Sequence, residues 1–311
     1  MRIWTGCLTE QGTVLPEPDT RPTPLQKMRL SGVSPDRALG QNFLIDPNIV
    51  DVIERTAALG PDDVVLEVGP GLGVLTERLV QRCGNVHCIE LDAALAGLLA
   101  KEFGGARGFH LVAADALKLD LRLLEPAPRK FVANLPYNVA VPLVMKSLEE
   151  LPELEMWCLM LQREIADRLF ALPGTSAYGG TSVMARLFAE KISSRPVSGT
   201  VFHPRPRVRS SLLAFRRRPE ADVGGFPAVR AVVRAAFSHR RKTLANSMAG
   251  AADGRLPTAF TRLDAAGRKR TAVAALSGMG LAENTRPQDL TPEQYLELTE
   301  FLEGGAGGSG G

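Results

Sequence analysis

The string Asn134-Leu135-Pro136-Tyr137 combines an amide, a rigid turn and an aromatic ring. The exocyclic amine of adenine is a poor nucleophile because its lone pair is delocalised into the ring. An asparagine side-chain carbonyl and the backbone carbonyl before a proline can each accept a hydrogen bond from that amine, which would orient its lone pair toward an electrophilic methyl group. Pro136 stiffens the turn, and Tyr137 offers a π-face on which an extruded base can stack. The string therefore predicts methyl transfer to a base; its alternative is a loop without chemistry.

A glycine-rich turn, Gly69-Pro70-Gly71-Leu72-Gly73, follows the apolar run Val64-Val65-Leu66-Glu67-Val68. Glycines let the backbone approach a ligand closely and adopt positive φ. Glu90 ends the next apolar run, where a carboxylate can accept hydrogen bonds from ribose hydroxyls. Both features fit a nicotinamide cofactor as well as S-adenosylmethionine. Each also has a plain alternative, namely a strand-helix turn and a surface acid.

Apolar, β-branched runs at 64–68, 85–90, 109–113 and 130–133 alternate with stretches of helical spacing that begin near 74 and cover 93–101. Strands that alternate with helices predict βαβ units, and hence an α/β fold with a parallel sheet and helices on both faces. The strand signals stop near residue 219. Helical spacing over 227–248 and 295–301 then predicts a small C-terminal helical domain.

Basic residues gather in the second half of a chain whose net charge is only +3. Residues 195–218 contain seven arginines and no acid, and residues 223–252 form a second basic run without acids. Arg230, Arg234 and Arg241 are spaced by four and seven residues, which places them on one face of a helix. Such a stripe can follow a phosphate backbone, although a solvated positive face is the alternative. The predicted RNA-binding residues are Arg230, Arg234, Arg240, Arg241 and Lys242.

The composition, with 45% hydrophobic and 23% charged residues, is typical of a globular protein. The four cysteines form no CxxC pair, which suits a reducing cytosol. No apolar run approaches the ~20 residues of a membrane helix, and the N-terminus lacks a signal-peptide core. The histidines lack ligand spacing. We therefore expect a cytoplasmic protein with no metal and no membrane partner.

These motifs occur in the order seen in the rRNA adenine dimethyltransferases, and the chain resembles the small-subunit rRNA members of that family over about residues 36–303. The matching strings are Leu39-Gly40-Gln41-Asn42-Phe43-Leu44, Leu66-Glu67-Val68-Gly69-Pro70-Gly71-Leu72-Gly73, Ile89-Glu90-Leu91-Asp92, Asp115-Ala116-Leu117, Asn134-Leu135-Pro136-Tyr137-Asn138, Leu161-Gln162-Arg163-Glu164, Tyr178-Gly179, Phe202-His203-Pro204-Arg205-Pro206-Arg207-Val208-Arg209-Ser210, Ala236-Phe237-Ser238-His239-Arg240-Arg241-Lys242-Thr243-Leu244 and Leu290-Thr291-Pro292-Glu293-Gln294-Tyr295.

The resemblance implies a Rossmann-like class I methyltransferase sheet, S-adenosylmethionine as cofactor, and dimethylation of adenine N6 on two adjacent adenosines near the 3′ end of 16S rRNA during small-subunit assembly. By the same resemblance, Gly69 would lie against the methionine part of the cofactor, Glu90 on its ribose and Asp115 on its adenine amine. The implied cofactor-binding residues are Asn42, Leu44, Gly69, Glu90, Asp115 and Asn134. The implied catalytic residues are Asn134, Pro136, Tyr137 and Phe202, with Phe202 closing over the target base or, alternatively, packing in the core.

The resemblance also suggests how the chain is divided. Residues 1–35 lack periodicity and are expected to be a disordered tail, within which Met28 is an alternative start. Residues 36–218 would form the S-adenosylmethionine-binding domain and 219–303 a small helical RNA-binding domain. Residues 304–311 are a glycine-rich tail. A monomer acting on 16S rRNA or the immature small subunit is expected.

Three other functions compete with this one. They are a 23S rRNA adenine-N6 methyltransferase that confers macrolide resistance, a ribosome-assembly factor with a dormant site, and a nicotinamide oxidoreductase. The intact Asn134 and Glu90 argue against dormancy, and Leu135 before the proline favours the small-subunit group. The family usually has Val-Asp-Ser where this chain has Val208-Arg209-Ser210. The missing acid makes this loop more basic and leaves its effect on substrate choice open.

Overall fold

The computed structural model describes residues 22–36, 40–221, 224–239, 241–252, 257 and 260–304. A seven-stranded sheet lies at the centre, in the order β4-β3-β2-β5-β6-β9-β7. The first five of these strands are parallel, and β9 runs antiparallel to both β6 and β7. The strands are β2 (Val64–Val68), β3 (Asn85–Glu90), β4 (Phe109–Ala113), β5 (Lys130–Asn134), β6 (Met156–Gln162), β7 (Ala189–Val197) and β9 (Ser210–Arg217). The predicted parallel α/β sheet is confirmed, while β6, β7 and β9 were not predicted.

Helices cover both faces of the sheet because alternate side chains of a strand point to opposite faces. Val65 and its equivalents on neighbouring strands pack with α2 and α3, whereas Leu66 and its equivalents pack with α5 and α7. The helices of this part of the molecule are α2 (Pro47–Ala57), α3 (Val74–Arg82), α4 (Ala93–Phe103), α5 (Ala140–Glu150), α6 (Arg163–Leu169) and α7 (Gly180–Phe188).

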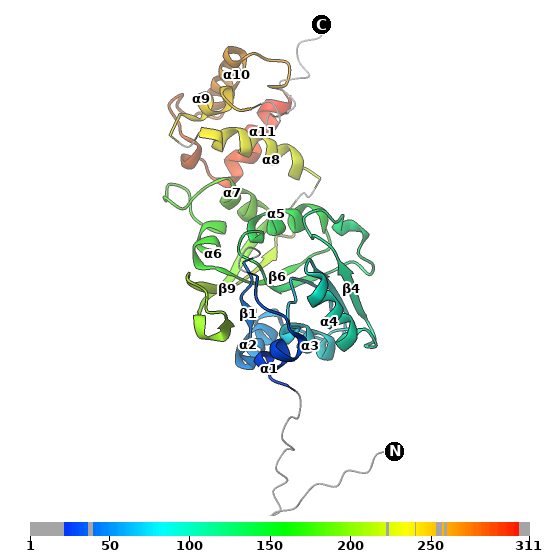
Figure 1. The fold of residues 1–311 in the computed structure, drawn as a ribbon. Coiled ribbons are helices and arrows are strands. Elements are labelled where there is room, and N and C mark those ends of the chain that lie inside the picture. Colours follow the sequence, from blue (N-terminus) through cyan, green and yellow to red (C-terminus); the bar gives the residue numbers. More distant parts are fainter. Residues whose placement is uncertain are drawn as a thin grey trace, which may run out of the picture.

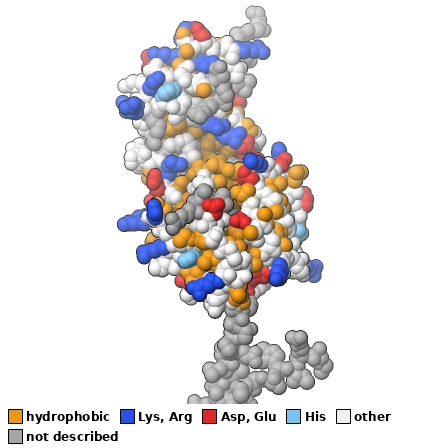
Figure 2. Space-filling model, viewed as in Figure 1, with side chains coloured by type: hydrophobic (Ala, Val, Ile, Leu, Met, Phe, Trp, Pro, Cys, Tyr) orange, Lys and Arg blue, Asp and Glu red, His pale blue; other side chains and the backbone are white. Residues whose placement is uncertain are grey.

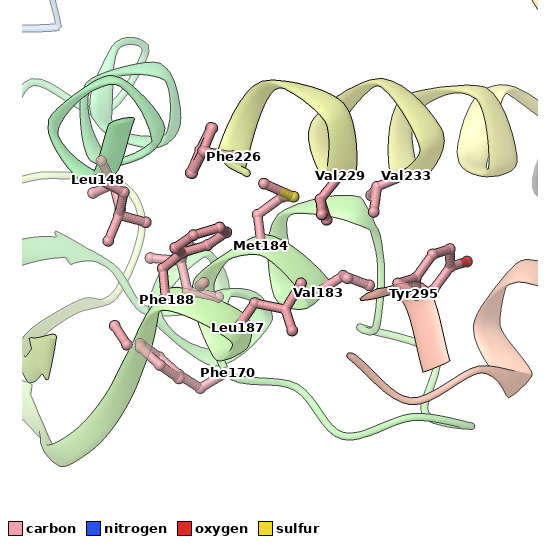
Figure 3. Packing of buried hydrophobic residues seen from close by; sticks show 14 of the residues in the cluster. Leu148, Phe170, Val183, Met184, Leu187, Phe188, Phe226, Val229, Val233 and Tyr295 are labelled. Atoms are coloured by element: carbon pink, nitrogen blue, oxygen red, sulfur yellow. The ribbon is translucent and has the colours of Figure 1, made fainter. Parts of the chain in front are cut away.

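The C-terminal helices stack on one end of this sheet unit (Figure 1). Figure 3 shows Val229 and Val233 of α8 and Tyr295 of α11 gathered over Val183 and Met184 of α7. These side chains belong to the same hydrophobic cluster as one face of the sheet, so the two parts share a continuous core. The C-terminal helices are α8 (Phe226–Ala236), α9 (Leu244–Ala249), α10 (Ala265–Gly278) and α11 (Pro292–Gly304).

The prediction of one helix over residues 227–248 is wrong. Helix α8 ends at Ala236, the chain turns through the short 3₁₀ helix η3 (Phe237–His239), and α9 begins at Leu244. Side-chain hydrogen bonds stabilise the turn, because the Ser238 hydroxyl donates to the Ser247 carbonyl (2.9 Å) and the His239 N–H to the Ser247 hydroxyl (2.9 Å). Serine side chains compete in this way with helical backbone bonds. The last predicted helix, at 295–301, lies within α11.

A helix that was not predicted, α1 (Pro24–Ser31), lies within the segment expected to be a tail. Thr23 caps its N-terminus in a capping box with Gln26. Lys27 pairs with Glu102 of α4 and lies 5.5 Å from the centre of the Phe103 ring. Figure 1 shows α1 at the end of the molecule opposite the C-terminal helices. Of the tail predicted for residues 1–35, residues 1–21 lie outside the described residues. Of the tail predicted for 304–311, Gly304 is the last residue of α11 and residues 305–311 lie outside the described residues.

A two-stranded sheet joins segments far apart in the chain. Strand β1 (Phe43–Leu44) pairs antiparallel with β8 (Phe202–His203), with Leu44 opposite Phe202. This pairing holds the segment before α2 against the segment before β9. Phe43 and Leu44 of β1 line the cleft described next, whereas β8 pairs with β1 and does not itself line it among the described residues.

Candidate functional site

The main cleft opens at the carboxyl ends of β2, β3 and β5. The strand order reverses between β2 and β5, and such switch points are where open α/β sheets bind ligands. The cleft encloses about 1050 Å³ of empty space, counting its open mouth. All predicted cofactor-binding residues line it, together with two of the other predicted catalytic residues; these are Asn42, Leu44, Gly69, Glu90, Asp115, Asn134, Pro136 and Tyr137.

The glycine turn after β2 brings its backbone close to the segment Asn134-Leu135-Pro136-Tyr137, called the catalytic string from here on. Gly69 has a φ of +71°, and a Cβ atom built on it would lie 3.2 Å from Cδ of Pro136. Gly71 has a φ of +58°, and its Cβ would lie 3.0 Å from the Phe43 ring. A side chain at either position would be strained and crowded. The glycines therefore allow the turn to pack closely against two other parts of the cleft, the N-terminal segment at Phe43 and the catalytic string at Pro136.

Glu90 is held firmly at the end of β3. One carboxylate oxygen accepts a hydrogen bond from the Gly71 N–H (3.1 Å) and the other from the Asp92 N–H (2.9 Å). Its side chain is 5% exposed, and burial raises its pKa. A carboxylate oriented in this way by the backbone keeps lone pairs for hydroxyl donors on the cleft side.

Asp115 also lines the cleft, just after β4, the strand that pairs with β3. One carboxylate oxygen accepts a hydrogen bond from the Leu117 N–H (3.0 Å), and the other lies 3.7 Å from the Lys118 ammonium. The first contact fixes the side chain in a tight turn, and the second is a solvent-exposed pair of little energetic weight. The carboxylate thus faces the cleft partly exposed and can still accept from an amine.

Asn134, the last residue of β5, is oriented by the N-terminal segment. Its side-chain N–H₂ donates to the backbone carbonyl of Asn42 (3.1 Å), and the Asn42 side chain in turn donates to the Gly40 carbonyl (3.0 Å). An amide whose nitrogen is occupied presents its oxygen as an acceptor. The arrangement gives Asn134 the acceptor that the sequence analysis required.

Tyr137 borders the mouth of the cleft and is half-buried. Its hydroxyl is 2.8 Å from the hydroxyl of Ser210, the first residue of β9. Burial raises the pKa of this phenol. Its hydroxyl is engaged by Ser210, while the residue also lines the cleft.

Phe202 differs from the other predicted catalytic residues. Its side chain is 3% exposed and packs in a core cluster with Leu44, Val50 and Val201, and it does not border the cleft among the described residues. The pairing of β8 with β1 directs it there. The structure thus places Phe202 in the core, the alternative already set out for it, and its contact with a target base stays a prediction.

Two residues on the cleft wall were not singled out from the sequence. Glu67 is 2% exposed inside β2 and accepts hydrogen bonds from the Thr76 hydroxyl (2.7 Å) and the Cys88 thiol (3.4 Å). Burial raises its pKa to about 7. Leu91 is 57% exposed beside Glu90 and offers an apolar surface to the cleft. An acid in an otherwise apolar strand was the signal for Glu67, whereas nothing in the sequence distinguishes Leu91 from other leucines.

The predicted RNA-binding residues do not share one helical face. Arg230 lies over the Phe226 ring and pairs with Glu149 of α5, so it joins the C-terminal helices to the sheet unit. Arg234 is exposed on α8, whereas Arg241 and Lys242 are exposed in the turn beyond η3. Arg240 lies outside the described residues. The prediction of an arginine stripe on a single helix is therefore wrong. Arg234 on α8 and Arg241 and Lys242 in the turn still form exposed basic positions.

Three arginines of the basic run 195–218 also have structural partners. Arg216 pairs with Glu190 on the neighbouring strand. Arg217 donates to the carbonyls of Leu148, Leu151 and Leu154 and stacks on Trp157. Arg218 donates to the Arg186 carbonyl and pairs with Glu220. The exposed arginines of the run are Arg195, Arg205, Arg207, Arg209 and Arg216.

The described residues contain no group of three or more His, Cys, Asp or Glu side chains that could hold a metal ion. Among the helices in the same part of the chain, none has the length and apolar character needed to cross a membrane.

Comparison with known proteins identifies the class of this site. The "Ribosomal RNA small subunit methyltransferase A" of Streptomyces coelicolor is 41% identical over 295 residues, covering 92% of this chain and 98% of that protein. The protein of the same name from Rubrobacter xylanophilus is 38% identical over 264 residues, covering 85% and 94% of the two chains.

Two solved structures are also similar. A dimethyladenosine transferase from Plasmodium falciparum is 25% identical with a TM-score of 0.68, covering 85% of this chain and 98% of that one. The 23S rRNA methyltransferase ErmE is 29% identical with a TM-score of 0.56, covering 84% of this chain and all of that one (100%). The model of the ribosomal RNA adenine dimethylase family matches residues 34–268. The chain belongs to the ribosomal RNA adenine dimethylase family.

Proposed function

We propose that this enzyme uses S-adenosylmethionine to dimethylate N6 of two adjacent adenosines near the 3′ end of 16S rRNA, during assembly of the small subunit in the cytoplasm. The observation that carries the proposal is the orientation of Asn134. Its nitrogen is bound to the Asn42 carbonyl at 3.1 Å, so its oxygen is left to accept from the amine that is methylated. The same residue lies beside the glycine turn on which the cofactor would rest.

The cleft fits S-adenosylmethionine by its chemistry. The positive-φ turn at Gly69 and Gly71 provides backbone without side chains, and Glu90 provides a buried acceptor for ribose hydroxyls. Asp115 lies where it can accept from the adenine amine, and the exposed Leu91 can pack on the ring between them. We assign Asn42, Leu44, Gly69, Glu90, Asp115 and Asn134 to cofactor binding.

When bound, S-adenosylmethionine supplies a methyl group on a positively charged sulfur. The residues of this chain then have to orient the attacking amine. The Asn134 side-chain oxygen and the Leu135 backbone carbonyl, which precedes Pro136, would each accept an N6 hydrogen bond and direct the nitrogen lone pair toward the methyl group. Tyr137 would support the extruded base by stacking. No general base is required to start this step, because the amine attacks in its neutral form. The cofactor would leave as a neutral thioether, and the methylated nitrogen would then release one proton to solvent.

Charge on the surface supports an RNA partner. Figure 2 shows Lys and Arg side chains over the C-terminal end and at several places along both margins of the molecule. In the helical unit, α10 exposes Lys269 and Arg270, whereas α11 exposes Glu297 and Glu300. Phosphates are attracted to exposed basic side chains and repelled by exposed acidic ones. We assign RNA binding to residues 219–303 and catalysis to residues 36–218, acting as a monomer.

The small subunit is favoured over the large one by the relatives. The proteins at 38% and 41% identity are named for the small subunit, and the 23S rRNA methyltransferase is 29% identical. A test adds the purified protein and S-adenosylmethionine to ribosomal subunits from a strain that lacks this methyltransferase. Primer extension on both rRNAs should stop at two adjacent adenosines near the 3′ end of 16S rRNA. Stops in 23S rRNA instead would assign the protein to the macrolide-resistance group, and the absence of stops would overturn catalysis.

A further inference from the structure

The hydroxyl groups of Tyr137 and Ser210 lie 2.8 Å apart, which joins the catalytic string to a strand that does not border the cleft. Ser210 is 2% exposed, and it is the first residue of β9. Ladder pairing holds it on both sides, opposite Gln162 of β6 and Val197 of β7. The tyrosine hydroxyl therefore contacts a residue that is paired with a strand on each side.

The backbone of the catalytic string is attached to the same region. The Leu135 N–H donates to the Met160 carbonyl of β6 (3.2 Å), and the Arg163 N–H donates to the Arg209 carbonyl (2.8 Å), just before Ser210. The Tyr137 ring is thus held at both ends, by its own backbone and by the hydrogen bond between its hydroxyl and Ser210. A half-buried ring without the second point could turn about its side-chain torsions toward solvent.

We propose that Ser210 is a positioning residue for the methyl-transfer reaction, which holds the Tyr137 ring at the angle at which an extruded adenine can stack. The inference rests on the proposed function, since it assumes that Tyr137 meets the target base. A base that reaches a loosely held ring loses alignment with Asn134, and small misplacements of reacting atoms are costly in rate. Ser210 needs no contact with RNA or cofactor in this role.

The phenol itself has no evident chemical task that would account for the contact. Burial raises the pKa of Tyr137, so the hydroxyl does not ionise near neutral pH and does not serve as a base. Its contact with a buried serine on β9 is then explained by geometry.

The test compares single-turnover methylation of unmethylated small subunits by four proteins: wild type, Ser210→Ala, Tyr137→Phe and the double variant. Each single change removes the same hydrogen bond while Tyr137→Phe keeps the ring. Each should lower the rate by roughly 3- to 10-fold, the factor expected for one neutral hydrogen bond, with cofactor affinity unchanged. The double variant should be no slower than the singles, because the bond can be lost only once.

A matched control is Ser211→Ala. Ser211 is 3% exposed on the same strand, and its hydroxyl bonds to Ser194 and to the Arg195 carbonyl instead. This variant should keep the wild-type rate. A second readout uses an RNA with 2-aminopurine at the target position, whose fluorescence is quenched on stacking. Quenching should weaken in Ser210→Ala and not in Ser211→Ala.

The outcomes separate this inference from the proposed function. Wild-type protein that fails to methylate small subunits overturns the function itself. An active wild type together with a full rate in Ser210→Ala, or with losses that multiply in the double variant, overturns the positioning role and leaves the function intact.

Discussion

The side-chain nitrogen of Asn134 is bound to the backbone carbonyl of Asn42, at 3.1 Å, across 92 residues of sequence. The contact decides which end of the amide faces the cleft. In the proposed function Asn134 orients the target amine and the Asn42 segment binds the cofactor, so this one hydrogen bond would couple cofactor binding to orientation of the amine.

Replacing Asn134 should affect catalysis far more than folding. Asn134→Ala removes an acceptor for N6 and should lower the single-turnover rate by about 10²–10³-fold, as for other preorganised polar contacts. Asn134→Asp keeps an acceptor, but it places a carboxylate oxygen against the Asn42 carbonyl, so we expect it to be no more active than alanine. Circular dichroism controls for folding, and Asn246→Ala, exposed on α9, should behave as wild type. High activity in the aspartate variant would show that the contact with Asn42 is unimportant.

Glu90 should control cofactor affinity. Glu90→Ala should weaken S-adenosylmethionine binding by about 1.5–3 kcal/mol, the usual worth of a hydrogen bond to a charged group, and Glu90→Gln by less. Lowering the pH should protonate Glu90 and weaken cofactor binding. Because burial raises the pKa of Glu90, this loss of cofactor affinity in the wild type should begin at a higher pH than for an ordinary glutamate. Calorimetry over a pH series measures both effects. Glu297→Gln on the exposed face of α11 is the control. An unchanged cofactor affinity in Glu90→Ala would show that the ribose does not bind at Glu90.

The basic surface should be divided between RNA binding and structure. Replacing Arg234, Arg241 and Lys242 by Gln should reduce the slope of log K against log salt by roughly two to three units, if each neutralises one phosphate. Arg230→Gln should leave the slope nearly unchanged and lower stability instead, because Arg230 pairs with Glu149. Filter binding at several salt concentrations measures the slope. If Arg230→Gln reduced the salt slope by as much as each of the other substitutions does, Arg230 would belong to the RNA interface.

Arg217 should contribute to stability without affecting RNA binding. It donates to three carbonyls at the end of α5 and beyond it, and burial lowers its pKa to about 10. Arg217→Met should lower the free energy of unfolding by roughly 2–4 kcal/mol, because those carbonyls lose a charged donor. Arg216→Met, one residue away and exposed, should cost little. Urea unfolding compares the two, and equal losses would contradict the role of the α5 contacts.

Glu67 should make stability depend on pH in the opposite direction from most acids. Its folded-state pKa is raised to about 7 from 4.5, so the folded protein binds a proton that the unfolded chain releases. The resulting stabilisation is complete below the unfolded pKa and is lost as the pH rises through about 7. Glu67→Gln cannot ionise, so its stability relative to wild type should increase between pH 4.5 and 7 by the order of 3 kcal/mol. A difference that does not change with pH would indicate that Glu67 is ionised in the folded protein.

The sequence predicted the cleft better than it predicted the periphery, for a physical reason. Gly69, Glu90 and Asn134 each end or follow an apolar run, and the carboxyl ends of parallel strands must meet at one edge of the sheet. Strand β7 escaped notice because it is an edge strand, with Lys191 and Arg195 exposed where a central strand would be apolar.

Contacts between distant segments could not be predicted. Phe202 is buried because β8 pairs with β1, more than 150 residues earlier, and no local pattern indicates that pairing. Arg217 counted as part of a basic run because its partners are backbone carbonyls, which every residue possesses. In both cases the residue type could be read from the sequence, but the segment that it contacts could not be predicted.

The core shared by α7, α8 and α11 has a consequence during synthesis on the ribosome. When the nascent chain has emerged only as far as Arg218, the sheet can pair fully, but Val183 and Met184 of α7 lack the side chains of α8 and α11 that pack over them (Figure 3). They stay open to water, and to other nascent chains, until α8 and α11 have also left the exit tunnel. Completion of the catalytic half therefore waits for the end of translation, and a messenger truncated between the two halves would produce an aggregation-prone fragment and not a weaker enzyme.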